Sequence, residues 1–228
     1  MSHLSGNPQG PRVAVILSGC GYLDGAEINE AVISLLALNR GGAQVRCYAP
    51  DKPQMHVVDH LTGQPSPGES RNVLRESARI ARGQIAPLSE LSADDFDALF
   101  MPGGFGVAKN LSTFAVDGTS GQVDPDLARV LKEFRDAGKP IGAVCISPAV
   151  LVLALGEGEV TIGSDPGTAG AIESLGGVHH VCPVDDIHVD TRRRIVTAPA
   201  FMEDVQLATV ADGIEKAVAA TLELVAGR

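Results

Sequence analysis

Short, continuously apolar runs alternate along this chain with longer segments in which apolar residues have helical spacing. Residues 13–17 form a continuous apolar run and residues 45–49 a mostly apolar one, and between them residues 26–40 place apolar side chains three or four positions apart. A strand, a helix and a second strand in this order predict a right-handed crossover and a parallel sheet. Unbroken apolar strands are buried on both faces, so helices are expected on both sides of the sheet.

The same alternation continues to the end of the chain and predicts a three-layer α/β/α sandwich with a mostly parallel sheet. Residues 13–228 are expected to form this single domain, after a polar tail of residues 1–12 rich in glycine and proline that is expected to be disordered. The further predicted strands are residues 55–59, 98–101, 141–144, 160–162, 180–184, 187–190 and 195–198; the further predicted helices are 72–82, 126–137, 168–175 and 204–225, with a short helix within 87–95 and loops at 61–70 and 112–124.

Cys145 is the residue with the clearest chemical signal. Residues 141–144 predict a buried strand, and Ser147 and Pro148 predict a helix start, with serine at the N-cap and proline at the first helical position. Cys145 would then occupy a sharp strand-to-helix turn, the geometry of a nucleophile elbow. The partial positive charge of the helix N-terminus favours a thiolate there. The alternative is a buried structural cysteine at the end of a strand.

Two glycine-rich turns follow predicted strands at the same edge of the sheet, where open α/β sheets bind ligands. In residues 102–106 (Pro-Gly-Gly-Phe-Gly), the N–H of Gly104 could form an oxyanion hole with the N–H of Ile146. The other interpretation is a tight turn without a ligand. Residues 18–25 contain only a weak match to a dinucleotide-binding fingerprint.

Glu30 lies one turn into the helix predicted after the first glycine-rich turn. If that helix begins near the carboxyl edge of the sheet, Glu30 reaches Cys145. A protonated carboxyl group there would donate a hydrogen bond to a thiolate, and an ionised one could act as a general base. Glu27 is the rival for this role, and two acids at this place argue against a bound pyrophosphate.

Composition narrows the classes of partner. The net charge of −10 argues against nucleic acid or an anionic membrane as a partner, and no apolar run approaches the roughly 18 residues of a membrane span. Without a secretory signal, the expected location is cytoplasmic. The cysteines show no C-x-x-C spacing, so no metal site is expected, although Cys20 could pair with Cys145. The four cysteines are Cys20, Cys47, Cys145 and Cys182.

These motifs together resemble the PfpI superfamily. This superfamily has the class I glutamine amidotransferase-like, flavodoxin-like fold and includes the Parkinson's-associated protein deglycase. The chain is most similar to its ElbB-type glyoxalase branch, and the likeness extends over nearly the whole chain beyond residue 12. It is carried by residues 143–149 (Ala-Val-Cys-Ile-Ser-Pro-Ala), 102–106, 25–30 (Gly-Ala-Glu-Ile-Asn-Glu), 15–21, 49–52, 60–63, 71–74, 108–111 and 182–187.

The resemblance implies an activity and roles for individual residues. It implies that Cys145 is the nucleophile, that Glu30 is its acidic partner, and that Gly104 and Ile146 are the oxyanion-hole donors. ElbB-type proteins are associated with conversion of glyoxal to glycolate without a cofactor and with isoprenoid production. A homodimer is also implied.

One departure from the superfamily pattern affects the mechanism. Many members carry a histidine about twenty residues after the cysteine, whereas residues 161–167 here contain none. Asp165 could replace it, or Glu30 could perform all the proton transfers. Three later histidines would contribute only if folding brings them near: His179, His180 and His188.

Two functions are therefore consistent with the sequence. The first is a cofactor-independent glyoxalase that converts glyoxal, a small dicarbonyl, to glycolate through a hemithioacetal on Cys145. The alternative is an amidotransferase-like binding or redox-sensing protein, associated with isoprenoid biosynthesis, whose Cys145 is oxidised and turns over little substrate.

Overall fold

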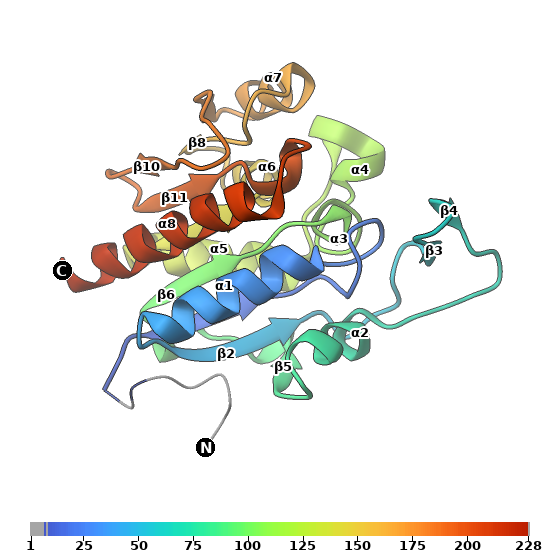
Figure 1. Ribbon diagram of the computed structural model, residues 1–228, viewed down its shortest axis with the longest axis horizontal. Coiled ribbons are helices and arrows are strands. Elements are labelled where there is room, and N and C mark those ends of the chain that lie inside the picture. The colour runs from blue at the N-terminus through green and yellow to red at the C-terminus, as the bar shows by residue number, and fades with distance from the viewer. Residues whose placement is uncertain (1–6, 8, 228) are drawn as a thin grey trace.

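The structure is a computed structural model that describes residue 7 and residues 9–227. A seven-stranded sheet lies at its centre in the order β10-β11-β7-β6-β1-β2-β5, and every strand is parallel to its neighbours except β10, which is antiparallel to β11 (Figure 1). The strands are β1 Arg12–Ile16, β2 Gln44–Ala49, β5 Ile85–Pro87, β6 Ala98–Met101, β7 Ile141–Val144, β10 His188–Asp190 and β11 Ile195–Ala198, with two small sheets formed by β3 Val58–Asp59 and β4 Gln64–Pro65, and by β8 Glu159–Val160 and β9 Val178–His179.

Helices cover both faces of the sheet. Figure 1 shows α1 and α8 side by side over one face, with α5 on the other. The α-helices are α1 Ile28–Arg40, α2 Val73–Ile80, α3 Phe105–Lys109, α4 Phe114–Asp117, α5 Pro125–Asp136, α6 Ser147–Leu155, α7 Pro166–Ser174 and α8 Leu207–Ala226, and the 3₁₀ helices are η1 Leu88–Glu90, η2 Ala93–Asp95, η3 Gly118–Ser120 and η4 Ala200–Met202. The predicted three-layer sandwich is confirmed.

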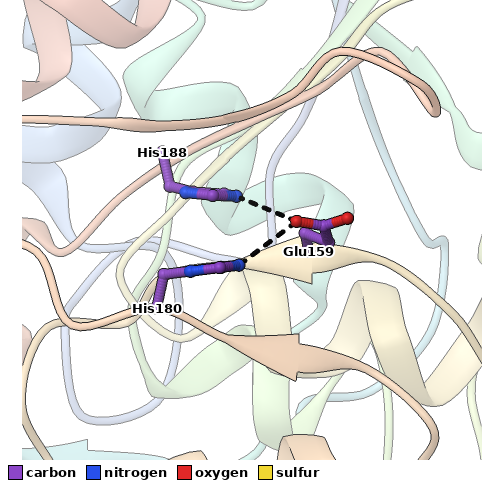
Figure 2. Close-up of side chains that lie close together, drawn as sticks. All are labelled: Glu159, His180 and His188. Atoms are coloured by element: carbon purple, nitrogen blue, oxygen red, sulfur yellow. Dashed lines mark hydrogen bonds and ion pairs between the residues drawn. The ribbon is translucent and has the colours of Figure 1, made fainter.

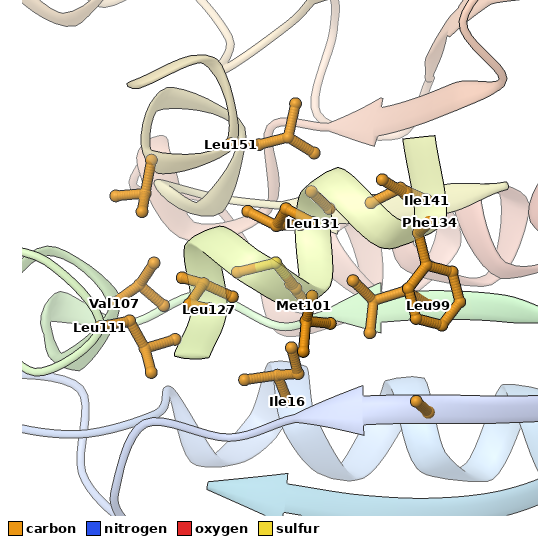
Figure 3. Packing of buried hydrophobic residues seen from close by; sticks show 14 of the residues in the cluster. Ile16, Leu99, Met101, Val107, Leu111, Leu127, Leu131, Phe134, Ile141 and Leu151 are labelled. Carbon is orange, nitrogen blue, oxygen red and sulfur yellow. The ribbon is translucent and has the colours of Figure 1, made fainter. Parts of the chain in front are cut away.

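The unbroken apolar strands supply two separate cores. In β1, Val13 and Val15 face α1 and α8, whereas Ala14 and Ile16 face the opposite side, because successive side chains of a strand point to opposite faces. Figure 3 shows the second core, in which side chains of β1 and β6 meet those of α5. The labelled residues from these elements are Ile16, Leu99, Met101, Leu127, Leu131 and Phe134.

Several predicted boundaries are wrong. The strand predicted over residues 180–184 is absent from these described residues, and the short β9 ends just before it; Pro183 lacks the N–H that a strand interior needs. The strand predicted at 55–59 is reduced to β3. The three-residue β5 was missed, and the loop predicted at 112–124 holds α4 and η3.

Part of the predicted N-terminal tail is ordered against the domain. Residues 1–6 and 8 lie outside the described residues. The N–H of Asn7 donates a hydrogen bond to the carbonyl of Gly42 at 3.1 Å, and Arg12 already begins β1. The domain therefore includes residue 12.

A buried asparagine joins the loops at the carboxyl edge of the sheet. Asn110 is 2% exposed. Its Nδ2 donates to the carbonyls of Ser18 and Asp24, both at 2.8 Å, and its Oδ1 accepts the N–H of Met55 at 2.9 Å. One side chain thus fixes the first glycine-rich turn against the segment before β3.

Replacing Asn110 with leucine is expected to lower the free energy of unfolding by about 2–4 kcal/mol, because three backbone groups lose their partner without gaining water. Urea denaturation of the wild type and Asn110→Leu measures this change. Asn29→Leu is the control, since Asn29 is exposed and that substitution should change stability by less than about 0.5 kcal/mol. Equal effects of the two substitutions would contradict the role of Asn110.

Candidate active site

Cys145 lies on a strand-to-helix turn, as the sequence predicts. β7 ends at Val144, Cys145 adopts a left-handed backbone conformation with φ of 62°, and α6 begins two residues later. The predicted N-cap is wrong: Ile146 occupies that position, and Ser147 is the first helical residue. The Ser147 hydroxyl instead donates to the carbonyl of Pro102 at 2.7 Å, which ties the elbow to the second glycine-rich turn.

That second turn lies so close to the elbow and α1 that Gly103 and Gly104 have no room for side chains. A Cβ atom on Gly103 would lie 2.3 Å from the Cβ of Cys145 and 2.8 Å from both its Sγ and the Oε2 of Glu30. Gly104 has φ of +99°, and a Cβ there would lie 2.3 Å from the backbone nitrogen of Glu27. The glycines therefore allow the backbone to approach the thiol and the start of α1.

Glu30 is fully buried beside the thiol. Its Oε2 accepts the N–H of Gly103 at 2.8 Å, its Oε1 accepts the N–H of Phe201 at 3.1 Å, and its side chain also hydrogen-bonds to Cys145. Burial, which penalises the charged carboxylate, raises the pKa of Glu30 to about 7, although the backbone donors oppose the shift. The group can therefore give up or accept a proton near neutral pH.

The thiol differs from the sequence expectation. Cys145 is 7% exposed, and burial, followed by the nearby Glu30 carboxylate, raises the pKa of the thiol well above its ordinary value. The expected depressed pKa is therefore corrected: the helix terminus does not outweigh burial beside a second acid. The N–H groups of Gly104 and Ile146 hydrogen-bond to the sulfur and oppose this shift.

Glu30 and Cys145 form a buried pair of acids whose ionisations are coupled. Loss of one proton leaves one negative charge on the pair, and that charge disfavours loss of the second. When the charge moves from Glu30 to the Cys145 sulfur, the N–H groups of Gly104 and Ile146 receive it. The arrangement is suited to forming a thiolate by proton transfer to Glu30 as a substrate binds.

A cavity of 290 Å³ opens above Cys145, with a mostly apolar lining. A larger hollow of 680 Å³ lies at the opposite edge of the sheet, but the described residues that line it include no cysteine or histidine. The smaller cavity is therefore the candidate site. It is lined by Tyr22, Glu27, Gly104, Phe105, Cys145, Ile146, Thr168, Phe201 and Met202.

Phe201 and Met202 were not predicted from the sequence. They lie in η4, directly after β11 at the carboxyl edge of the sheet, where Phe201 supplies a backbone donor to Glu30. Their place after a predicted strand was the available signal. Tyr22 and Thr168 were not predicted as site residues either. Tyr22 lies in the first glycine-rich turn and Thr168 in α7, and only the folded chain brings these two elements to the same cavity.

The three weaker candidates lie elsewhere or have other partners. Glu27 lines the cavity, but its carboxylate is the N-cap of α1 and accepts the N–H of Glu30 at 2.6 Å; burial raises its pKa. Asp165 is the N-cap of α7, where hydrogen bonds from Thr168 lower its pKa, and it does not line the cavity. Cys20 is free, as is Cys145, so the considered disulfide is not formed.

Among the described residues, no histidine lines the cavity. His180 and His188 instead stack on each other, with centroids 3.9 Å apart, near Glu159. Burial and the neighbouring His180 lower the pKa of His188, and burial lowers that of His179, whose Nε2 accepts the N–H of Ile162. The histidine missing after Cys145 has no substitute here, and Glu30 is the base closest to the thiol.

A cysteine elbow at the carboxyl edge of a mostly parallel sheet, facing a buried glutamate from the first helix, places this protein among class I glutamine amidotransferase-like proteins. Comparison with known families agrees with this class. The chain belongs to the DJ-1/PfpI family, whose family profile matches residues 13–206. The resemblance to the PfpI superfamily is therefore confirmed, whereas membership of the ElbB-type branch stays a prediction.

The chain is similar to named relatives over almost its whole length. The human protein called glutamine amidotransferase-like class 1 domain-containing protein 3, mitochondrial, is 54% identical over 97% of this chain and 86% of its own. The rat ES1 protein homolog, mitochondrial, is 52% identical over 93% and 84%. The crystal structure of an Ehrlichia chaffeensis isoprenoid biosynthesis protein with an amidotransferase-like domain superposes with a TM-score of 0.89 at 42% identity, covering 94% of this chain and 99% of that one.

In the part of the chain that the structure describes, every helix is too short or too polar to cross a membrane. The human and rat relatives are named as mitochondrial proteins. The cytoplasmic location expected from the sequence stays a prediction.

Proposed function

We propose that this protein is a glyoxalase that converts glyoxal to glycolate through covalent catalysis by Cys145. The observation that carries the proposal is the buried hydrogen bond between Cys145 and Glu30, together with the pKa of Glu30 near 7. A carboxyl group with this pKa can accept a proton and return it at neutral pH, as the reaction requires.

The chemistry begins with transfer of the thiol proton to Glu30. The thiolate adds to one aldehyde carbon of glyoxal, a C–S bond forms, and the new oxyanion takes the proton back to give a hemithioacetal. Glu30 then removes the C–H proton of that carbon and delivers it to the neighbouring carbon through an enediol. The product is a thioester of Cys145. Water hydrolyses it, which releases glycolate and restores the thiol, so one carbon is oxidised as its neighbour is reduced.

The surroundings of the sulfur support this sequence of steps. The N–H groups of Gly104 and Ile146 interact with the sulfur and would stabilise negative charge that develops on or beside it. The lining of the cavity is mostly apolar and its volume is larger than glyoxal needs, so the site also has room for 2-oxoaldehydes with an apolar substituent.

The redox-sensing alternative is less well supported. Sensor cysteines are exposed and have low pKa values, because the thiolate is the form that oxidants attack. Cys145 is 7% exposed, and burial raises its pKa. A sensor would show selective oxidation of Cys145 by peroxide and negligible turnover of any dicarbonyl.

The proposal is tested by measuring glycolate released from glyoxal by the purified wild-type protein. Saturable formation of glycolate is expected, with phenylglyoxal as a second substrate that probes the apolar cavity. A rate that stays proportional to the glyoxal concentration, as for an incidental thiol reaction, would overturn the enzymatic role.

The dependence of kcat/KM on pH is expected to identify Glu30 as the base. The base must be ionised, so kcat/KM should rise with pH and level off above about 7, where the raised pKa of Glu30 lies. Glu30→Gln should lose about 10²–10⁴-fold in kcat/KM and lack this rising limb. Initial rates between about pH 5 and pH 9 measure both effects.

Glu27 provides the sharpest comparison. It is the other carboxyl group that lines the cavity, and burial raises its pKa as well. If Glu27→Gln removes the limb near pH 7 and Glu30→Gln retains it, the assignment of the base to Glu30 is wrong. Circular dichroism establishes that both variants are folded before their rates are compared.

An exposed apolar stripe on α1 supports the predicted homodimer. Ile28, Val32 and Leu36 form an apolar stripe on α1, and each is between 44% and 49% exposed in the single chain. Four-residue spacing places the three side chains on one face of the helix. Sedimentation of the purified protein measures whether the chain self-associates.

A further inference from the structure

We propose that Glu159, His180 and His188 form a binding site for a divalent transition-metal ion, with Zn²⁺ the best match. Their ligand atoms all lie within 4.8 Å of one another. Figure 2 shows the two imidazole rings one above the other, both directed at the Glu159 carboxylate. Two imidazoles and one carboxylate are a ligand set that holds zinc in proteins and leaves a fourth position for water.

The distances in the cluster are close to those of a metal site. The Nε2 atoms of His180 and His188 lie 3.2 Å and 3.9 Å from the same Oε2 of Glu159. Zinc–ligand bonds of about 2.0–2.1 Å in a tetrahedron place ligand atoms about 3.3 Å apart. His180 already has this separation from Glu159. The lone pair of an imidazole nitrogen lies in the ring plane, so the two stacked rings must tilt out of their stack for both nitrogens to bind one ion.

His188 has a polar atom without a partner. Its Nε2 is buried and has no hydrogen-bond partner among the described residues, because 3.9 Å is too long for a hydrogen bond to Glu159. Buried polar atoms are nearly always satisfied, and an ion or water is a common reason when the protein offers no partner. A metal ion bound by both Nε2 atoms and the Glu159 carboxylate would satisfy this nitrogen.

The backbone already holds the three ligands in place. The N–H of Glu159 donates to Asp190 at 3.0 Å, and Asp190 follows His188 by two residues in β10. Arg193 fixes that aspartate with its backbone N–H and its guanidinium, at 2.9 Å and 3.0 Å. On the other side, the N–H of His180 donates to the carbonyl of Val160 at 2.9 Å. Only side chains need to move for binding, which lowers its cost.

The place of the cluster suggests what a bound ion would do. Glu159 and His180 stand at the two ends of a segment that contains α7, and α7 carries Thr168 into the cavity above Cys145. A metal ion would join these ends to the edge strand β10. Glu159 and His180 are partly exposed, so an ion can enter from solvent. A bound ion would therefore restrain residues 159–180, the segment whose helix α7 lines one side of the cavity.

The test is titration of the chelator-treated full chain with Zn²⁺ and, separately, Co²⁺. Wild type is expected to bind one equivalent per chain with micromolar or tighter affinity. Cobalt should give visible absorption typical of a four-coordinate site without the charge-transfer band of a thiolate ligand, which excludes binding at Cys145 or Cys20. The melting temperature should rise with Zn²⁺.

His180→Ala and His188→Ala are each expected to weaken binding by more than about 100-fold, since even residues that only orient ligands change affinity about 10–100-fold. His56→Ala is the matched control, because His56 is exposed and outside the cluster. The side chain of His180 is 40% exposed and lies outside both cores, so its removal leaves them intact. Undiminished binding in both cluster variants, or no wild-type binding below millimolar metal, would overturn the proposal.

Discussion

Cys145→Ser is expected to abolish glycolate formation from glyoxal, with a loss in kcat/KM of roughly 10³-fold or more. A serine hydroxyl is far less acidic than a thiol, and a carboxylate with a pKa near 7 cannot ionise it appreciably. The variant should fold normally, because serine is smaller than cysteine and can keep the contacts with Glu30, Gly104 and Ile146. Initial rates and thermal unfolding measure the two properties separately.

The control for this substitution is Cys20→Ser. Cys20 is also free and follows the first strand at the same edge of the sheet, but it does not line the cavity, so activity should stay near that of wild type. Acid-quenched wild type should carry a glyoxal-derived adduct on the peptide containing Cys145. Equal activity in the wild type and Cys145→Ser would rule out the covalent mechanism.

Gly103→Ala is expected to damage activity and stability together. The new methyl group would lie 2.3 Å from the Cβ of Cys145 and 2.8 Å from Glu30, so the elbow or α1 must move. Overpacking of this kind costs about 1–3 kcal/mol of unfolding free energy. A displacement of about 1 Å between reacting groups can reduce the rate about 100-fold.

Gly170→Ala is the control that tests whether the loss of activity and stability in Gly103→Ala is specific to the position beside Cys145. Gly170 lies within α7, and a Cβ there would meet nothing within 4 Å. Alanine in a helix interior is favoured over glycine by about 0.5–1 kcal/mol, so this variant should be slightly more stable and fully active. Urea denaturation and kcat/KM of both variants provide the comparison. An active, stable Gly103→Ala protein would mean that the close approach is dispensable.

The layers of the fold could be predicted because the strands and long helices have distinctive patterns. Residues 13–17 form an apolar run that only a doubly covered strand explains, and β1 lies there. Short elements could not be predicted for the opposite reason. β5 has three residues and ends in proline, so its sequence is too short to show a pattern of apolar and polar positions. The antiparallel β10 was found because its hairpin with β11 is local in the sequence.

The turns that form the candidate site could be predicted from the sequence, whereas the pKa of the Cys145 thiol could not. Cys145 and Gly104 could be identified because each lies in a turn that directly follows a predicted strand. The structure brings both residues to Glu30. The direction of the thiol pKa was wrong because local sequence reveals the helix terminus but not the depth of burial. The cluster of Glu159, His180 and His188 was also missed, since its members meet only after three strands assemble.

The left-handed backbone conformation of Cys145, with φ of 62°, lowers the stability of the folded protein. A cysteine in this conformation is strained, whereas glycine adopts it freely. Cys145→Gly would relax the turn but would remove the buried sulfur and its contacts. Backbone strain of this kind occurs mainly at functional sites, which agrees with the role proposed for the Cys145 thiol.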